Sequence, residues 1–440
     1  MAKELIKNVV CPFCGSACDD IEVEVEDGKI LNVYNACSVG TATFFPQPGV
    51  KRFKKPLWRE KKTDDFQEIE WETALDKAAE ILTNAKRPLM FGWCETSCET
   101  MRMGTKVAEL TQSIMDSQIT HCHGPTFQAI QMVGEPTCTL GEIKNRADVV
   151  VYWGCNPLNG HPRHLSRYSS FPRGFFREEG RLGRKLIVVD PRYSDTAKAA
   201  DHYYKVNLGE DYLLFNALRA VVNGVELEQE EIAGVKKEDI VNLAEMMKKA
   251  AFGIVFFGMG LTHSLGKSQN IAGAIQLVQL LNGPSKWSIM PLCGHYNVNG
   301  FAQVMSWTAG FPYSVDFCRG APRYNPGEYT SIDMLQKGLI DAMFVISADP
   351  GSHMPQRAVE HMVKIPLIVS EMHPTSTTQL ANLILPATVN GIEAAGTCYR
   401  MDGVPLHMTK VVDPPKGLFE SDTVMMKKLY EKVLARQEED

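Results

Sequence analysis

Two stretches decide the fold: 147-ADVVVYWGCNPLNGHP-162 and 342-AMFVISADPGSHMP-355. Each has a short, continuous apolar run, then an Asn or Asp followed by proline, and a histidine a few residues further on. Apolar runs without polar alternation are typical of strands in parallel sheets that helices cover on both faces. We therefore expect two related strands, with Asn156-Pro157 and Asp349-Pro350 beyond their carboxyl ends, where such sheets bind ligands.

Similar runs recur along the chain at 88-PLMFGW-93, 185-KLIVVD-190, 252-FGIVFFG-258 and 366-PLIVSE-371. Between them, segments such as 73-TALDKAAEILTNA-85 place apolar residues on one face of a helix. This alternation predicts an α/β protein built from two related α/β domains with mostly parallel sheets.

The composition is that of an ordinary soluble protein, with 44% hydrophobic and 22% charged residues. The apolar run at 251-AFGIVFFGMGL-261 is too short to span a membrane. The N-terminus has neither an apolar signal core nor a twin-arginine pair, so we expect a cytoplasmic protein without a membrane span. A net charge of −6 gives no general attraction to nucleic acid.

Four of the twelve cysteines crowd the first forty residues, at Cys11, Cys14, Cys18 and Cys37. Their C-x2-C-x3-C spacing plus one distant cysteine lacks the second C-x2-C pair of a zinc ribbon, which favours a [4Fe-4S] cluster over zinc or structural thiols. Between them, 21-IEVEVEDGKILNV-33 alternates around Asp27-Gly28 and predicts a β-hairpin. The cysteines are then expected on loops beside a small sheet.

A further cysteine is notable because it lies between two histidines, in 120-THCHGPT-126. The Gly124-Pro125 step should stop a helix, so we expect the triplet on a turn or a loop. A zinc site, a reactive thiol with a histidine base, a ligand to a larger group and a plain structural cysteine all remain open.

Two further loops suggest nucleotide binding. The run ending at Val189 is followed by Asp190-Pro191-Arg192, a third Asx-Pro step that either contacts a nucleotide or only starts a turn. The loop 258-GMGLTHSLGKS-268 has five residues between its last two glycines instead of the four of a P-loop, which excludes an NTPase. Its amides, with a helix expected from Ser268 to Leu281, still suit a diphosphate.

In this order, the N-terminal cysteines, CHGPT, WGCNPLNGHP, LIVVDPRYSDTAKAAD, FFGMGLTHS and 380-LANLILPATVNGIEAAGTCYR-400 resemble molybdopterin oxidoreductases of the formate dehydrogenase and dimethyl sulfoxide reductase type. Within that superfamily, GHYNVNG followed by FCRGAPRYNPGEYT, and the short length, are similar to the B subunits of formylmethanofuran dehydrogenases. The resemblance implies α/β domains around a bis-pterin cofactor: an N-terminal [4Fe-4S] domain at 1–57, one pterin domain at 58–145 and 326–390, a second at 146–325, and a C-terminal segment at 391–440 that folds back with a terminal helix.

The resemblance also assigns roles. Cys122 would ligate molybdenum or tungsten beside two molybdopterin guanine dinucleotides, and His123 would lie at the open face of the metal. Cys11, Cys14, Cys18 and Cys37 would hold the [4Fe-4S] cluster. The cofactor-binding residues would be Gly154, Asn156, Pro157, His161, Asp190, Arg192, Gly258, Met259, Gly260, Asp349 and His353.

The implied reaction is the reversible two-electron reduction of CO2 to formate, the first step of formylmethanofuran synthesis in methanogenesis. A formate dehydrogenase catalytic subunit and an inactive Fe–S relay or scaffold subunit are the alternatives. The metal, molybdenum or tungsten, and the direction of the reaction stay open.

Three departures from the pattern matter. Formate dehydrogenases have an arginine where this chain has Cys293, so Arg319 is expected to anchor the substrate, with Arg323 as the second choice. Val39 replaces a lysine expected between cluster and pterin. Relatives end in a β-barrel domain that is absent here, so we expect a partner subunit to supply that cover, together with an amidohydrolase-like formyl-transferring subunit and ferredoxin-like electron donors.

Overall fold

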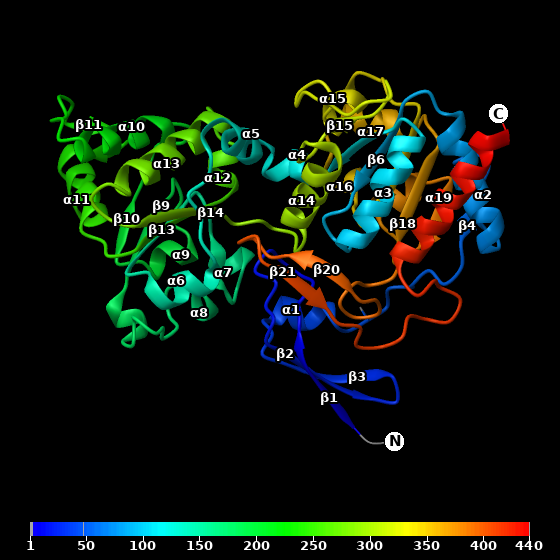
Figure 1. Ribbon diagram of the computed structural model, residues 1–440, viewed down its shortest axis with the longest axis horizontal. Coiled ribbons are helices and arrows are strands. Elements are labelled where there is room, and N and C mark those ends of the chain that lie inside the picture. Colours follow the sequence, from blue (N-terminus) through cyan, green and yellow to red (C-terminus); the bar gives the residue numbers. More distant parts are fainter. Residues whose placement is uncertain (1–2, 47, 440) are drawn as a thin grey trace.

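The computed structural model describes residues 3–46 and 48–439 and contains two α/β parts that lie side by side (Figure 1). Each part is built around its own sheet, and the N-terminal strands lie below the junction of the two parts. No helix within the described residues is long and apolar enough to cross a membrane. The α/β fold expected from the apolar runs is confirmed.

The first sheet has five strands in the order β10-β9-β8-β13-β14, and all of its neighbours are parallel. Successive side chains of these strands point into different cores: Val149 and Val151 pack with the helices of one face, whereas Val150 and Tyr152 pack on the other. Burial on both faces explains why the runs are continuously apolar. The strands are β8 (Val149–Trp153), β9 (Lys185–Val189), β10 (His202–Tyr204), β13 (Gly253–Phe257) and β14 (Trp287–Pro291).

The helices that cover this sheet on one side are α10 (Asp211–Val222), α11 (Lys237–Lys248) and α13 (Ser268–Leu281), and α6 (Leu140–Arg146) lies on the other side. The helix predicted from Ser268 to Leu281 is confirmed.

The second sheet has nine strands in the order β16-β15-β7-β6-β17-β18-β19-β4-β5. Its centre, from β7 to β19, is parallel, and short antiparallel strands close both edges. The strands are β4 (Leu57–Trp58), β5 (Gln67–Glu68), β6 (Pro88–Gly92), β7 (Ile114–Ser117), β15 (Val315–Asp316), β16 (Arg323–Tyr324), β17 (Ala342–Ile346), β18 (Leu367–Glu371) and β19 (Leu383–Pro386). Because β15 and β16 join this sheet, residues 315–324 belong with it. The boundary between the two α/β domains, expected after residue 325, therefore lies earlier in the chain.

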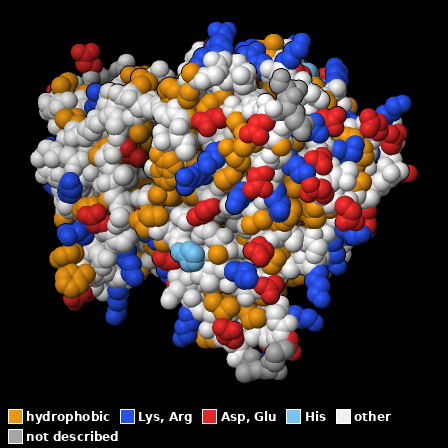
Figure 2. Space-filling model, turned by 45° about the vertical axis from the view of Figure 1, so that its right-hand side comes forward, with side chains coloured by type: hydrophobic (Ala, Val, Ile, Leu, Met, Phe, Trp, Pro, Cys, Tyr) orange, Lys and Arg blue, Asp and Glu red, His pale blue; other side chains and the backbone are white. Residues whose placement is uncertain are grey.

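One face of the nine-stranded sheet is covered by α2 (Trp71–Asn84), α3 (Cys98–Leu110) and the terminal helix α19 (Asp422–Glu439). The helix α19 packs against α2 and α3 through buried residues that include Met426 and Leu429. On the other face lie α15 (Ser331–Gln336) and α17 (Gln356–Met362). Lys/Arg and Asp/Glu side chains are interspersed over the face seen in Figure 2.

Both sheets reverse their strand order once. In the first sheet the chain runs outward from β8 to β10 and then returns to start β13 on the other side of β8. In the second, β6 and β7 run one way, and β17, β18 and β19 run the other way from β6. Such reversals separate the loops at the carboxyl ends of adjacent strands and open a crevice there, which makes them the places where open α/β sheets bind ligands.

The N-terminal part is a three-stranded antiparallel sheet of β1 (Glu4–Val9), β2 (Ile21–Glu26) and β3 (Lys29–Tyr34), followed by α1 (Ser38–Thr43). The predicted hairpin is confirmed: Asp27 and Gly28 connect β2 to β3 with φ of 51° and 72°. Two positive φ values in a two-residue turn match the right-handed twist of the flanking strands.

The remaining elements are α4 (Ile119–Cys122), α5 (Gly124–Val133), α7 (Pro157–Gly160), α8 (His164–Arg167), η1 (Gly180–Gly183), α9 (Asp195–Lys198), β11 (Glu231–Ile232), β12 (Val235–Lys236), α12 (Met259–Thr262), α14 (Val298–Ala309), α16 (Pro350–His353), α18 (Ser376–Leu380), β20 (Gly396–Tyr399) and β21 (Pro405–Met408). They include two separate two-stranded sheets, β11 with β12 and β20 with β21.

Candidate active site

Cys122 lies at the junction of the two α/β parts, where α4 and α5 follow the carboxyl end of β7. The sequence predicts a turn or a loop for this triplet; the structure has a single helical turn, α4, that ends at Cys122, and a turn at His123. The helix does break, at His123 with φ of −115°, but Pro125 then starts α5 in its first turn, where proline is favoured. The thiol is half-buried, and burial raises the pKa of Cys122 to about 12.

His123 is buried and both of its ring nitrogens have partners. Nε2 lies 3.2 Å from the carbonyl oxygen of Leu292, and Nδ1 lies 3.1 Å from Oγ1 of Thr126. A carbonyl only accepts, so Nε2 carries the proton and Nδ1 accepts from the threonine hydroxyl. Burial lowers the pKa of His123 to about 4. In this arrangement His123 is neutral and supports Leu292, and neither ring nitrogen faces a substrate.

The histidine before Cys122 has a free nitrogen instead. Nε2 of His121 is buried and has no partner among the described residues. The ring of His121 contacts the ring of His353 edge-on, with centroids 5.1 Å apart, and its carbonyl oxygen accepts from Nε2 of His263 at 2.6 Å. Burial, followed by the charges of neighbouring imidazoles, lowers the pKa of His121 to about 4. A buried neutral imidazole with an unused nitrogen is suited to a polar ligand beside Cys122.

The two Asx-Pro loops make the same interactions, which supports their relationship. Oδ1 of Asn156 accepts from the backbone N–H and the hydroxyl of Thr196, at 3.3 and 2.6 Å. Oδ1 of Asp349 accepts from the same two groups of Thr377, at 2.7 and 2.6 Å. In each case, the Asx side chain holds in place a second loop, the one that follows the next strand of the sheet. Pro157 and Pro350 occupy the first turns of α7 and α16.

The other predicted loop residues also have internal contacts. Asp190 is buried and accepts from the backbone N–H of Arg192 at 2.8 Å, while the side chain of Arg192 is exposed. His353 is exposed, and its ring lies against that of His121. Burial lowers the pKa of His353, against the charge of Asp349. These residues lie at the carboxyl ends of the strands, as the sequence predicted. Their present contacts are with protein groups in or beside their own loops.

Glycines bring the loops of the first sheet into direct backbone contact at its strand reversal. The N–H of Gly260 donates to the carbonyl oxygen of Gly154 at 2.9 Å, and a Cβ on Gly260 would lie 2.6 Å from backbone atoms of Gly154. A Cβ on Gly258 would lie 2.6 Å from Cβ of Cys155. Between these glycines, Met259 leaves 48% of its surface exposed. The glycines are therefore required by packing, whatever ligand approaches them.

His161 and Cys293 connect the candidate site to the N-terminal part. Nε2 of His161 donates to the carbonyl oxygen of Cys293 at 2.7 Å, and the N–H of Gly15 donates to the same oxygen at 3.2 Å. Cys14 and His295 form an isolated antiparallel bridge beside this contact. The segment that begins with Cys293 therefore packs between the N-terminal cysteines and Cys122.

Arg319 is not near Cys122, and this expectation is corrected. The strand β15 runs antiparallel to β7 and pairs with its first residues, and the N–H of Phe317 donates to the carbonyl oxygen of Ser113. The exposed Arg319 follows at the amino end of β7, whereas Cys122 follows the carboxyl end. Arg323, the second choice, is held at the same amino end by an ion pair with buried Asp316.

The four N-terminal cysteines surround one small cavity, which Pro162 and Arg163 also line. A Cβ on Gly40 would lie 3.1 Å from Sγ of Cys11 and 3.4 Å from Sγ of Cys37. Glycine at this position therefore leaves both sulfur atoms without a crowding side chain. Across the described residues, no three His, Cys, Asp or Glu side chains converge on a single-ion site. Soft thiols arranged around a cavity are the donor set that a cubane iron–sulfur cluster requires, because each iron takes its own cysteine.

Burial dominates the electrostatics of these thiols. It raises the pKa of Cys14 to about 12 and also raises the pKa of Cys18, although the charges of Arg163 and Arg167 oppose the rise at Cys18. The buried thiols of Cys14 and Cys18 would stay protonated without a metal, so a bound cation is needed to use them as thiolates.

Sequence reasoning missed Glu135, which follows α5. Oε1 of Glu135 is buried without a partner among the described residues, and burial raises the pKa of this carboxyl to about 7. Burial, then the charges of Cys122 and Glu135, raise the pKa of the Cys293 thiol. The burial of Glu135 could not be predicted from the sequence, because it depends on the position of β14 in the folded protein.

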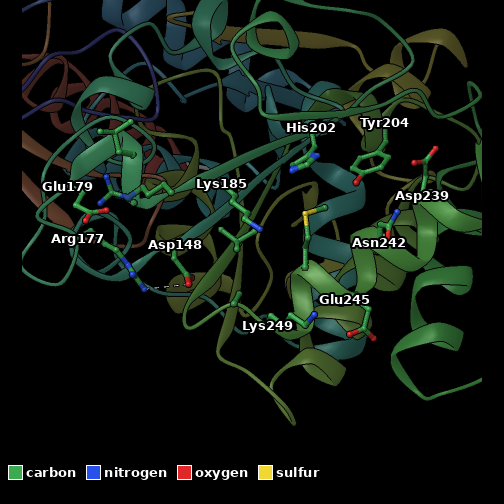
Figure 3. Close-up of a pocket in the computed structure, with 16 residues that line it drawn as sticks. Asp148, Arg177, Glu179, Lys185, His202, Tyr204, Asp239, Asn242, Glu245 and Lys249 are labelled. Atoms are coloured by element: carbon green, nitrogen blue, oxygen red, sulfur yellow. Dashed lines mark ion pairs between the residues drawn. The ribbon is translucent and has the colours of Figure 1, made fainter.

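A wide groove lies away from these residues, between α11 and the segment 177–185 (Figure 3). It is lined at the amino ends of β8, β9 and β10 by charged side chains of both signs, including the ion pair of Arg177 with Asp148 at 3.4 Å. The candidate site lies at the opposite, carboxyl ends of the strands, so this groove is separate from it.

Comparison with known proteins defines the class: the chain belongs to the molybdopterin oxidoreductase family, which matches residues 52–432, and it is an oxidoreductase. It is 51% identical over 430 residues to the B subunit of the tungsten-containing formylmethanofuran dehydrogenase 2 of Methanocaldococcus jannaschii, covering 98% of this chain and 99% of that protein. Identity to the alpha subunit of the F420-dependent formate dehydrogenase of the same organism is 25%, over 97% of this chain and 70% of that protein.

The fold is also found in a solved structure. One chain of the formyltransferase/hydrolase complex FhcABCD from Methylorubrum extorquens superposes with a TM-score of 0.70, covering 87% of this chain and 99% of that chain at 18% identity. At this identity the likeness shows the shared fold.

Proposed function

We propose that this chain is the catalytic subunit of a formylmethanofuran dehydrogenase, in which CO2 is reduced reversibly to formate at a molybdenum or tungsten centre. The observation that carries the proposal is Cys122, a soft thiol at the junction of the two parts, in a chain 51% identical to a tungsten-containing relative of that name. The formate dehydrogenase relative is more distant, and the match to it covers a smaller share of that protein's length.

The residues around Cys122 are suited to the group that the family requires. The thiol would ligate the metal, and the residue before it, His121, has a buried Nε2 without a partner among the described residues. Two guanine dinucleotide forms of molybdopterin would lie at the two strand reversals, one over the nine-stranded sheet and one over the five-stranded sheet. When bound, the metal and its sulfur ligands supply two-electron chemistry at the carbon of CO2 or formate.

The protein's own contribution is to hold the segment that faces Cys122 in one orientation and to exclude water from the site. His123 fixes Leu292 through Nε2, and His161 and Gly15 fix the next carbonyl, so the segment that faces Cys122 is held from two sides. The proton that accompanies reduction needs a carrier, and the carboxyl of Glu135 is the buried acid near Cys293 whose raised pKa suits exchange near neutral pH.

The four N-terminal cysteines would hold a [4Fe-4S] cluster that exchanges electrons with ferredoxin-like donors. Partner subunits, including a formyl-transferring one and one that covers the cofactors, would complete a complex. The solved neighbour comes from a complex of several subunits, which supports this arrangement.

The test is elemental analysis of the natively purified protein, with Cys122→Ala and Cys14→Ser as variants. We expect molybdenum or tungsten in near-equal amount to the chain, with iron. Cys122→Ala should abolish formate and CO2 turnover while the iron–sulfur absorption persists, and Cys14→Ser should remove that absorption. Iron without molybdenum or tungsten would instead favour a relay subunit, and zinc alone would refute both sites.

A further inference from the structure

Three arginines and three aspartates form one network beside the N-terminal cysteines. Nη1 and Nη2 of Arg163 donate to the two carboxylate oxygens of Asp20, at 2.6 and 2.7 Å. Arg167 pairs with both Asp19 and Asp20. The remaining members are Arg400 and Asp402, joined at 2.8 Å, with Arg400 also 3.6 Å from Asp19.

The network is placed asymmetrically about the cysteine cavity. Asp19 and Asp20 follow Cys18 directly in the chain, yet the cavity wall contains Arg163 and neither carboxylate. The side chains of Asp19 and Asp20 are 34% and 31% exposed, whereas Arg163 and Arg167 are each 21% exposed. Beside the cavity, Arg163 and Arg167 are therefore less exposed than their partners Asp19 and Asp20, whereas Asp402, the partner of Arg400, is fully buried.

We infer that the ion pair of Arg163 with Asp20 sets the reduction potential of the cluster held by the four cysteines. This inference depends on the proposed function, because it needs the cluster. Reduction adds one electron to a group that is already anionic, so a cation in the cavity wall stabilises the reduced form and raises the potential. Asp20 counteracts Arg163, and its partial exposure to water weakens this counteraction.

The same pair also explains why Val39 is tolerated. Val39 is 40% exposed on α1, next to Gly40, so a positive charge is missing on that side of the cavity. Arg163, the residue before α8, supplies a positive charge in the wall of the cavity. Its bidentate bond to Asp20 holds the guanidinium in one orientation, which a solvated lysine would not have.

The experiment is a redox titration of the natively purified complex, with dithionite as the one-electron reductant and the cluster's visible absorption and EPR signal as readouts. We expect Arg163→Gln to lower the midpoint potential and Asp20→Asn to raise it. Opposite shifts from the two halves of one ion pair are the decisive result, because loss of a merely structural contact would not give opposite signs. Arg177→Gln, which breaks the pair with Asp148 away from the cavity, is the matched control and should not shift the potential.

If Arg163→Gln fails to retain the cluster, Arg167→Gln and Asp19→Asn test the same signs on the neighbouring pair. Unchanged potentials, or shifts in the same direction for both halves of a pair, would overturn the inference while leaving the cluster in place. Absence of iron and of the EPR signal in the unmodified protein would overturn the proposed function itself, so the two failures are distinguishable.

Discussion

Replacing the buried carboxyl of Glu135 should make the protein more stable at alkaline pH. Burial raises the pKa of Glu135 from 4.5 to about 7. The folded state then binds the proton more tightly than the unfolded state, so stability is lost as the pH rises from 4.5 through 7. The shift corresponds to about 3 kcal/mol at pH 8 at 1.36 kcal/mol per pKa unit, which solvent access reduces to roughly 2 kcal/mol.

Glu135→Gln keeps the shape of the side chain and removes the charge. We expect the free energy of unfolding of this variant to exceed that of the unmodified protein by about 2 kcal/mol at pH 8 and by well under 1 kcal/mol at pH 5. The assay is urea unfolding at both pH values, under reducing conditions and followed by circular dichroism. Exposed Glu178→Gln is the matched control and should change neither value. A Glu135→Gln variant that is less stable at pH 8, or a difference independent of pH, would refute the reasoning.

The two Asx–threonine pairs should differ in strength, because Asp349 is charged and Asn156 is neutral: Thr377→Val should cost about 2 kcal/mol in urea unfolding and Thr196→Val about 1 kcal/mol. Equal costs would contradict a charged Asp349. Gly15→Ala places a Cβ 2.5 Å from the carbonyl oxygen of Cys293 and should lower stability by about 1–3 kcal/mol and reduce iron content, whereas Gly28→Ala, with no atom within 4 Å, should leave iron content unchanged. Gly260→Ala should lower the melting temperature, because its Cβ would overlap Gly154; an unaltered melting curve would argue against that contact.

Much of the fold could be predicted because a buried parallel strand is visible in the local sequence as a short, continuous apolar run. Each of the six apolar runs became a strand, and the helix around Ala78 was visible from its spacing. The strand β7 was missed because it is short and contains Asp116, a buried carboxylate whose partners, Thr120 and Ser331, are apparent only once the chain has folded.

The candidate site was predictable only at the level of residue types. Cys122 and the N-terminal cysteines are conspicuous by spacing, but the carbonyl oxygens bonded to Nε2 of His123 and of His161 lie more than a hundred residues away, which no pattern reveals. Arg319 was misplaced because the order of segments along the chain says nothing about the direction of β15. That strand runs antiparallel to β7 and carries the arginine to the far edge of the sheet.

The contacts of the cysteine loop also determine when it can form during synthesis. Cys11 to Cys18 leave the ribosome first, but the groups that hold this loop come later: Arg163 and Arg167, then Cys293, and finally Met401, whose N–H donates to the carbonyl oxygen of Gly15. At about 5–20 residues per second, the cysteines wait roughly 20–80 s for their last partner. During that interval the thiols belong to an unanchored segment, open to metal-delivery proteins and to oxidants alike. The contacts that hold the cysteine loop are therefore complete only when nearly the whole chain has been made.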